Sequence, residues 1–279
     1  MEFREKFVAF VDVLGFSDLV ERAEQGAGVT LSTIEAAVAD LGSQGDKAEI
    51  AKYGPTTCPG AARKSPDVDF QLTQVSDCVI VSTEVSPAGA ITITSHCWTA
   101  VMKLLRRGLM CRGHIRRGII AQDEARFIGT GYQEAAAREK KVSVFGRDQD
   151  DTGTPFVEID SAVTEYVDNC SDECVREMFG RLTYTNETFC AVFPFKRLSP
   201  SFAAGPEFDA AKERRNNDIV RGWIHRMKHA IDENTNMEDA KVVRKAEHYK
   251  AALDKQLAEC DRADEMIAML VSPFPQRRM

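Results

Sequence analysis

Residues 7–19 read FVAFVDVLGFSDL, and this stretch decides the fold. Its first seven residues have the β-branched and aromatic composition of a buried strand. One carboxylate, Asp12, lies inside that apolar run, and residues 14–17 behind it have the composition of a turn into a helix. An ionised carboxylate in such a place is costly unless a positive group meets it. The rest of the chain should therefore supply a positive partner for Asp12.

Length, composition and charge exclude several classes of protein. A chain of 279 residues that is 43% hydrophobic can form one large core, or a core domain with a smaller accessory domain. Its net charge of −7 argues against a general nucleic-acid binder. The first residues lack the apolar core and cleavage site of a signal peptide, and no run approaches the roughly 20 apolar residues of a membrane helix. We expect a cytoplasmic protein that binds neither nucleic acid nor membrane.

Periodicity and turn signals predict the elements that follow the first strand. Residues 16–40 have helical spacing interrupted by glycines, and residues 54–68 hold three prolines and should form a loop. The β-rich runs 70–75 and 78–85 are separated only by Ser76-Asp77, which predicts a hairpin. We then expect a helix at 87–107, a strand at 110–121, a helix at 129–142 and a strand at 154–160. This β-α-ββ-α-β order predicts an α+β fold with a ferredoxin-like sheet and helices on one face.

Two further features complete the predicted organisation. Arg112, His114 and Arg116 alternate along the strand at 110–121 and should share one face, which would be either solvated or a binding surface. The C-terminal third carries two apolar stripes at helical spacing with a polar turn between them, which predicts a helical hairpin from about 207 to 271. We therefore expect a sheet domain over residues 1–200 and a helical extension over 201–279.

Asp77 is the candidate partner for Asp12 at the edge of this sheet. In a split β-α-β sheet the first and third strands are neighbours, so the two carboxylates should lie close together, and both can stay ionised only around a cation. Oxygen ligands suit Mg²⁺ or Mn²⁺, with phosphate oxygens as further ligands. The amides of residues 14–17, leading into a helix, could hold a polyphosphate. Each aspartate alone also fits a structural role, as a helix cap or a turn residue.

At these residues the chain resembles the class III nucleotidyl cyclases. Their first motif, Phe-x-Asp-Ile-x-Gly-Phe-Ser/Thr, matches residues 10–17, FVDVLGFS, and their second aspartate matches Ser76-Asp77. The strand RGHIRRG (112–118) and the helix EAAAR (134–138) follow in the family's order, so that the likeness covers residues 5–160. It implies a class III cyclase sheet and a nucleotidyl cyclase domain over residues 1–200.

Within this family the chain looks closest to the bacterial pyrimidine cyclases of anti-phage defence, the Pycsar system. Where purine cyclases carry the lysine that reads adenine, this chain has Thr73, and where they carry an acidic partner it has, by a loose alignment, Phe127. Where the family carries a transition-state asparagine, this chain has Glu134. The resemblance thus implies conversion of UTP or CTP, with UTP favoured, to a 3′,5′-cyclic monophosphate that acts as a second messenger for a separate effector.

The same resemblance implies roles for individual residues. Asp12, Asp77 and the carbonyl of Val13 would bind two divalent ions, Mn²⁺ or Mg²⁺, for two-metal-ion catalysis. The residues expected to contact substrate are Gly15, Phe16, Ser17, Thr73 and Glu134. An arginine should stabilise the charge on the phosphoryl group, with Arg138 favoured over Arg116 and Arg112. Family members form homodimers with composite sites, so these arginines could act on the partner's substrate. Two alternatives remain: a class III cyclase of purines, and an inactive cyclase-like module that binds nucleotide or dimerises.

Overall fold

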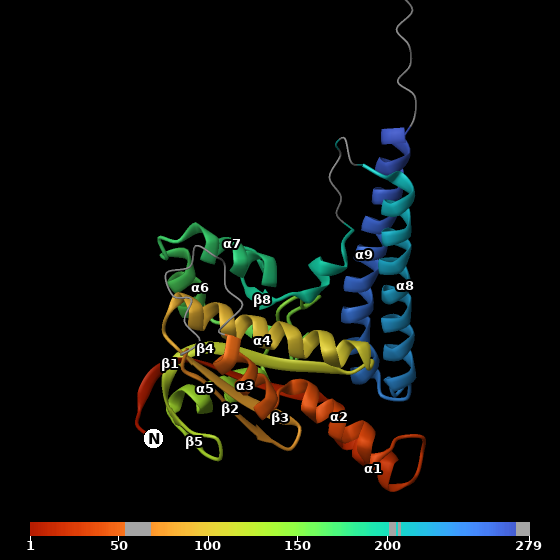
Figure 1. Ribbon diagram of the computed structural model, residues 1–279. Coiled ribbons are helices and arrows are strands. Elements are labelled where there is room, and N and C mark those ends of the chain that lie inside the picture. Colours follow the sequence, from red (N-terminus) through yellow and green to blue (C-terminus); the bar gives the residue numbers. More distant parts are fainter. Residues whose placement is uncertain (54–67, 201–204, 206–207, 272–279) are drawn as a thin grey trace, which may run out of the picture.

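The computed structural model describes residues 1–53, 68–200, 205 and 208–271 (Figure 1). The loop expected at 54–68 therefore lies, except for Val68, outside the described residues. The strands are β1 (Arg4–Leu14), β2 (Phe70–Val75), β3 (Cys78–Glu84), β4 (Met110–Gln122), β5 (Phe127–Ile128), β6 (Val157–Ile159), β7 (Thr183–Thr185) and β8 (Cys190–Val192). The helices are α1 (Phe16–Glu24), α2 (Leu31–Leu41), α3 (Gln44–Tyr53), α4 (Pro87–Arg106), α5 (Thr130–Glu139), α6 (Ser161–Asp168), α7 (Glu173–Leu182), the short 3₁₀ helix η1 (Pro194–Leu198), α8 (Ala210–Asn234) and α9 (Ala240–Val271).

The strands of the described residues form one mixed sheet in the order β2-β3-β1-β4-β6-β8-β7, with β5 paired to β4. β1 lies antiparallel between β3 and β4, so the first strand of the sequence is central. β2 and β3 form the predicted hairpin, and β6 runs parallel to β4. This arrangement confirms the predicted α+β class and the predicted neighbourhood of the first and third strands.

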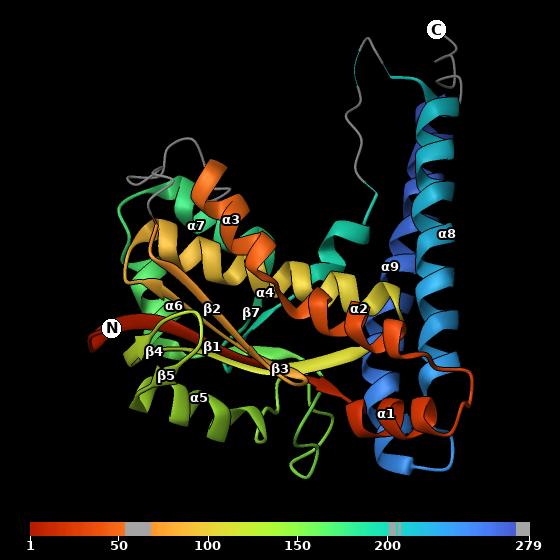
Figure 2. The ribbon, with the colours of Figure 1, turned by 60° about the horizontal axis from the view of Figure 1, so that its bottom comes forward.

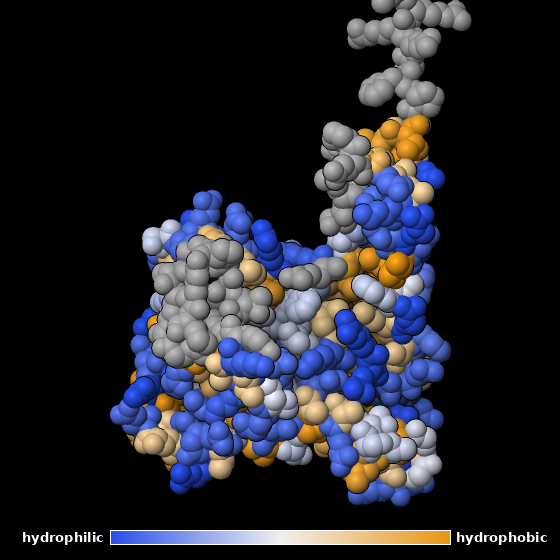
Figure 3. Space-filling view, viewed as in Figure 1, coloured by the Kyte–Doolittle hydropathy of each residue, from blue (hydrophilic) through white to orange (hydrophobic). Residues whose placement is uncertain are grey.

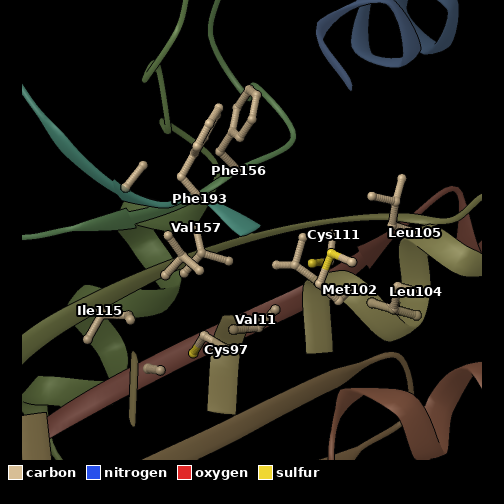
Figure 4. Packing of buried hydrophobic residues seen from close by; sticks show 14 of the residues in the cluster. Val11, Cys97, Met102, Leu104, Leu105, Cys111, Ile115, Phe156, Val157 and Phe193 are labelled. Atoms are coloured by element: carbon tan, nitrogen blue, oxygen red, sulfur yellow. The ribbon is translucent and has the colours of Figure 1, made fainter. Parts of the chain in front are cut away.

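One face of the sheet carries the main hydrophobic core. Alternate residues of β1, such as Val11, point to this face and pack against Cys97, Leu104 and other residues of α4 (Figure 4). β1 contributes fully buried side chains to this core, which accounts for the apolar run in its sequence. Ser86 caps α4 by accepting a hydrogen bond from Gly89 N at 3.0 Å, and Pro87 occupies the first turn of the helix.

The opposite face is covered in part by α5, which differs in detail from the expectation of helices on one face only (Figure 2). A small cluster of Val8, Ile80 and Ile120 packs there with Tyr132 of α5. The close approach depends on two glycines, because a Cβ on Gly118 would lie 2.7 Å from the Cα of Gly131. Most of the other side chains on this face are polar, so α5 covers a layer of polar side chains on the sheet.

The predicted C-terminal hairpin is confirmed as the pair α8 and α9 (Figure 1). Its lower half packs on the sheet region, where Ile231, Tyr249 and Leu253 belong to the main core. Its upper half projects beyond the sheet and ends in exposed apolar residues, among them Met266, Met269 and Leu270 (Figure 3). Within the described part of the chain, none of the helices combines the length and apolarity needed to cross a bilayer.

Candidate active site

The end of β1 brings Asp12 and Asp77 together. Asp12 is paired with Cys78 of β3 on one side and with Arg112 of β4 on the other. The turn before Cys78 is held against β1 by a hydrogen bond from Val13 N to Asp77 O at 3.0 Å. Ser76 gives this turn its shape with a left-handed φ of 53°. The two aspartates that the sequence analysis selected therefore lie at adjacent positions, at the same end of the central strands.

Negative charge accumulates at this edge. Burial first, and then the carboxylates of Asp77 and Glu139, raise the pKa of Asp12 from 3.8 to about 7. Arg112 and Lys140 act in the opposite direction without compensating. A hard divalent cation fits this donor set, because it would favour the ionised form of Asp12 and prefers oxygen ligands. Among the described residues, no cluster of three or more His, Cys, Asp or Glu side chains is arranged to bind a metal. A cation at this site would therefore be held by two carboxylates, with its other coordination positions open to substrate oxygens.

The turn after β1 leads directly into α1. Gly15 occupies the N-cap with a left-handed φ of 77°, and no side chain caps the helix. The amides of its first turn, at Phe16 and Ser17, are therefore not satisfied by a capping side chain. Helix N-termini of this kind attract phosphate groups. Asp18 lies in the same turn and contributes a negative charge.

The three candidate arginines are in different states. Arg112 forms an ion pair with Glu139 and also donates to Gly153 O at 3.3 Å. Arg116 forms an ion pair with Glu134, so two predicted site residues neutralise each other. Arg138, exposed on α5, makes no ion pair with any described residue and acts electrostatically on His114 and Glu158. Of the three, Arg138 is the one whose guanidinium is available to a ligand.

Thr73 is buried in a small polar network. Its hydroxyl donates to Asp123 O at 2.9 Å and accepts from Gln122 Nε2 at 3.0 Å, while the same nitrogen donates to Ile80 O at 3.0 Å. Ile80 O can only accept, so the amide of Gln122 must present its NH₂ group here. The carbonyl Oε1 of Gln122 is left buried without a hydrogen-bond partner among the described residues. The predicted contact of Thr73 with substrate would require this network to open.

Several residues of this region were missing from the sequence-based prediction. Glu139 and Lys140 follow the matched helix, but their proximity to Asp12 depends on how α5 lies along β4. Gln122 reaches β3 because β4 is long enough to pass beyond the end of its pairing with β1. Neither arrangement leaves a signal in residue spacing. The register of Arg112, His114 and Arg116 on one strand face was predictable, and the structure has it.

Comparison with known proteins gives structural matches only. No family model and no curated protein matches the sequence. The chain is similar to the catalytic core of a rhodopsin-guanylyl cyclase with converted specificity in complex with ATPalphaS, at 13% identity and a TM-score of 0.38, covering 61% of this chain and 85% of that one. It is also similar to a bacterial light-regulated adenylyl cyclase, at 13% identity and a TM-score of 0.39, covering 78% and 57% of the two chains.

A third match is a class III adenylyl cyclase-like ATP-binding protein from Pseudomonas aeruginosa, at 14% identity and a TM-score of 0.30. This likeness covers 59% of the present chain and 35% of that protein. The chain thus spans less than two thirds of the length of two of these three structures.

Proposed function

We propose that this protein is a nucleotidyl cyclase that converts UTP or CTP to the 3′,5′-cyclic monophosphate and pyrophosphate. One observation carries the proposal: Asp12 and Asp77 meet at a sheet edge whose next segment is a helix N-terminus without a capping side chain. Carboxylates that bind divalent ions, next to amides that bind phosphate, are what a metal-bound nucleoside triphosphate requires. The resemblance of residues 10–17 to the first motif of class III cyclases supports the same conclusion.

In the proposed reaction, the ribose O3′ forms a bond to the α-phosphorus and the bond from that phosphorus to the bridging oxygen breaks. The hydroxyl proton is lost and pyrophosphate leaves. Two Mn²⁺ or Mg²⁺ ions, held by Asp12, Asp77 and the Val13 carbonyl, would supply the positive charge that acidifies the hydroxyl and stabilises the leaving group. The amides of residues 15–17 orient the phosphates, and Arg138 stabilises charge on the phosphoryl oxygens.

The preference for a pyrimidine base is the finer part of the proposal. Thr73 stands where purine cyclases carry a lysine, and its hydroxyl is already engaged with Gln122 and Asp123. A purine edge would therefore lack the charged partner that reads it, and such losses discriminate strongly between substrates. We favour UTP, and we propose that the product is a second messenger of anti-phage defence, made by a cytoplasmic homodimer with composite sites.

Incubating the purified protein with each of the four NTPs and Mn²⁺, and identifying products by mass spectrometry, tests the proposal. We expect a cyclic pyrimidine nucleotide from the wild-type chain and none from Asp12→Asn or Asp77→Asn, with unchanged circular dichroism. Asp254→Asn is the matched control, because Asp254 pairs with Lys228 on the helical extension. Cyclic AMP as the main product would refute the pyrimidine assignment, and near-normal turnover by either site variant would refute the role of the carboxylates.

A second candidate function is nucleotide binding without turnover. It is favoured by the ion pairs that engage Arg112 and Arg116, which leave fewer free cations for a transition state. Binding of an NTP in calorimetry, without product from any of the four, would establish it in place of cyclisation.

A further inference from the structure

The lower end of the helix pair is fixed next to the candidate site. Gly108, in the turn between α4 and β4, approaches α8 so closely that a Cβ would lie 2.0 Å from Ala230 O. Asn234 Nδ2 donates to Arg107 O at 3.0 Å in the same contact. Both ribbon views show α1, which follows β1, beside this end of the pair (Figures 1 and 2). The helix pair therefore has a defined position relative to the end of β1.

The segment 140–156, between α5 and β6, connects α9 to Arg112. On one side Asp151 Oδ2 lies 3.0 Å from His248 Nε2, and Asp151 Oδ1 lies 3.1 Å from Arg244 Nε. On the other side Gly153 O accepts the hydrogen bond from Arg112. Asp151 and His248 are both buried, so this contact determines which face of α9 packs against the segment beside Arg112.

Lys245 lies on that part of α9. Three lysines of the helix pair are half-buried, and two of them form ion pairs: Lys228 with Asp254, and Lys250 with Asp232 at 2.7 Å. The amine of Lys245 has no described carboxylate within 4.0 Å. Burial first, and then the positive charge of Arg112, lower the pKa of Lys245, while Asp239 and Glu139 act in the opposite direction. Lys245 is thus a partly desolvated cation that interacts electrostatically with Arg112 and lacks a close anion among the described residues.

We propose that Lys245 binds the pyrophosphate portion of the nucleotide beside Arg112, so that the C-terminal helix pair contributes a residue to the site. The inference rests on the proposed function, because it takes a nucleoside triphosphate as the ligand at Asp12. Glu139, a buried carboxylate that acts electrostatically on Lys245, is already paired with Arg112. A polyphosphate is the multiply charged anion that the α1 amides and Lys245 would hold together, with the carboxylate pair binding it through a divalent ion.

Calorimetric titration with magnesium pyrophosphate tests the inference on the full chain. Lys245→Met keeps the aliphatic stem and removes the charge, and we expect its Kd to rise about tenfold or more, since hydrogen bonds to charged groups are worth roughly that factor. Lys245→Arg should bind nearly as the wild type does. Lys250→Met is the matched control, because it removes an equivalent charge that is already paired. A wild-type Kd for Lys245→Met, an equal loss in Lys250→Met, or no binding by the wild-type chain would each overturn the inference.

Turnover separates this inference from the proposed function. If no NTP is cyclised but Lys245→Met still weakens pyrophosphate binding, the proposed reaction fails and the phosphate-binding role stands. If a pyrimidine NTP is cyclised and Lys245→Met retains both the wild-type KM and the wild-type pyrophosphate Kd, the reaction stands and the role of Lys245 fails.

Discussion

His114 is a buried histidine between the sheet and α5, and its burial determines its charge. It lies on β4 opposite Phe10 and Glu158, is 2% exposed, and its Nδ1 has no hydrogen-bond partner among the described residues. Burial, assisted by Arg116 and Arg138 and opposed by Asp160, lowers the pKa of His114 from 6.5 to about 4. The imidazole is therefore neutral at neutral pH, although the strand that carries it also carries two arginines.

This pKa predicts a pH dependence of stability. A group whose folded pKa is depressed contributes stability that is present above its unfolded pKa and is lost as the pH falls toward its folded pKa. We expect His114 alone to lower the free energy of unfolding by about 2 kcal/mol between pH 7 and pH 4.5, while Asp12, whose folded pKa is raised, changes it in the opposite direction. Urea unfolding of the wild type and of His114→Gln at both pH values checks this, because the substitution should remove the fall that is due to His114 and leave the contribution of Asp12 unchanged. An equal difference in both proteins would contradict the assignment.

The individual residues of the candidate site were predictable to different degrees. Asp12 and Asp77 could be placed together because strand order in a split β-α-β sheet follows from the order of elements, and the Gly15 turn could be predicted from its position after a strand. The positions of Glu139 and Lys245 could not be predicted, because they depend on how α5 and α9 pack against the sheet. Side chains brought in by helix docking carry no local signature in the sequence.

At the scale of elements, the contact of α5 with β4 decides whether the candidate arginines can keep their positions. α5 supplies Glu139 to Arg112 and Glu134 to Arg116, and it carries Arg138 itself. The helix comes close enough for these pairs because Gly118 and Gly131 leave no side chains between it and the strand.

A methyl group at this contact should therefore move the helix. We expect Gly118→Ala to lower the free energy of unfolding by about 1–3 kcal/mol, as overpacking does, and to reduce turnover more than stability alone explains. Gly180→Ala is the control, because a methyl group added to this exposed glycine of α7 would meet no described atom within 4 Å and should be neutral or stabilising by up to about 1 kcal/mol. Thermal melts and turnover of both variants check this, and a Gly118→Ala protein with wild-type values would contradict it.

The long elements were predictable and the short ones were not. The hairpin of β2 and β3, the helix α4 and the C-terminal pair follow from clear periodicity over many residues. α6 and α7 lie in a stretch that the sequence left unassigned, although Asp160 and Asp172 are recognisable N-caps that accept from the amides of Ala162 and Cys174. β7 and β8 have three residues each, too few for a period to appear.

For the whole molecule, the helix pair and the sheet share one hydrophobic core. Ile224, Ile231 and Leu253 belong to the same buried cluster as Val11 and Leu104. The expected division at residue 200 stays a prediction about sequence organisation, while the packing joins both sides of it.

This shared core predicts one cooperative unfolding transition. The chain has two tryptophans, Trp98 on α4 and Trp223 on α8, so each can report alone when the other is replaced by phenylalanine. We expect both single-tryptophan proteins to give the same urea midpoint for sheet and helix pair. Leu253→Ala, at a fully buried site, should lower the free energy of unfolding by about 2–5 kcal/mol and shift both urea midpoints down together. Separate transitions would show that the pair unfolds independently.

The contact of Asp151 with Arg244 and His248 also has a consequence for biosynthesis. The strand with Asp12 is translated before the rest of the sheet, whereas α9 follows all of it. Until α9 has been translated, the segment beside Arg112 lacks its contacts with Arg244 and His248. Translation of α9 is then the step that finishes the proposed site, so an interrupted chain would carry the carboxylate pair and Arg112 without Lys245.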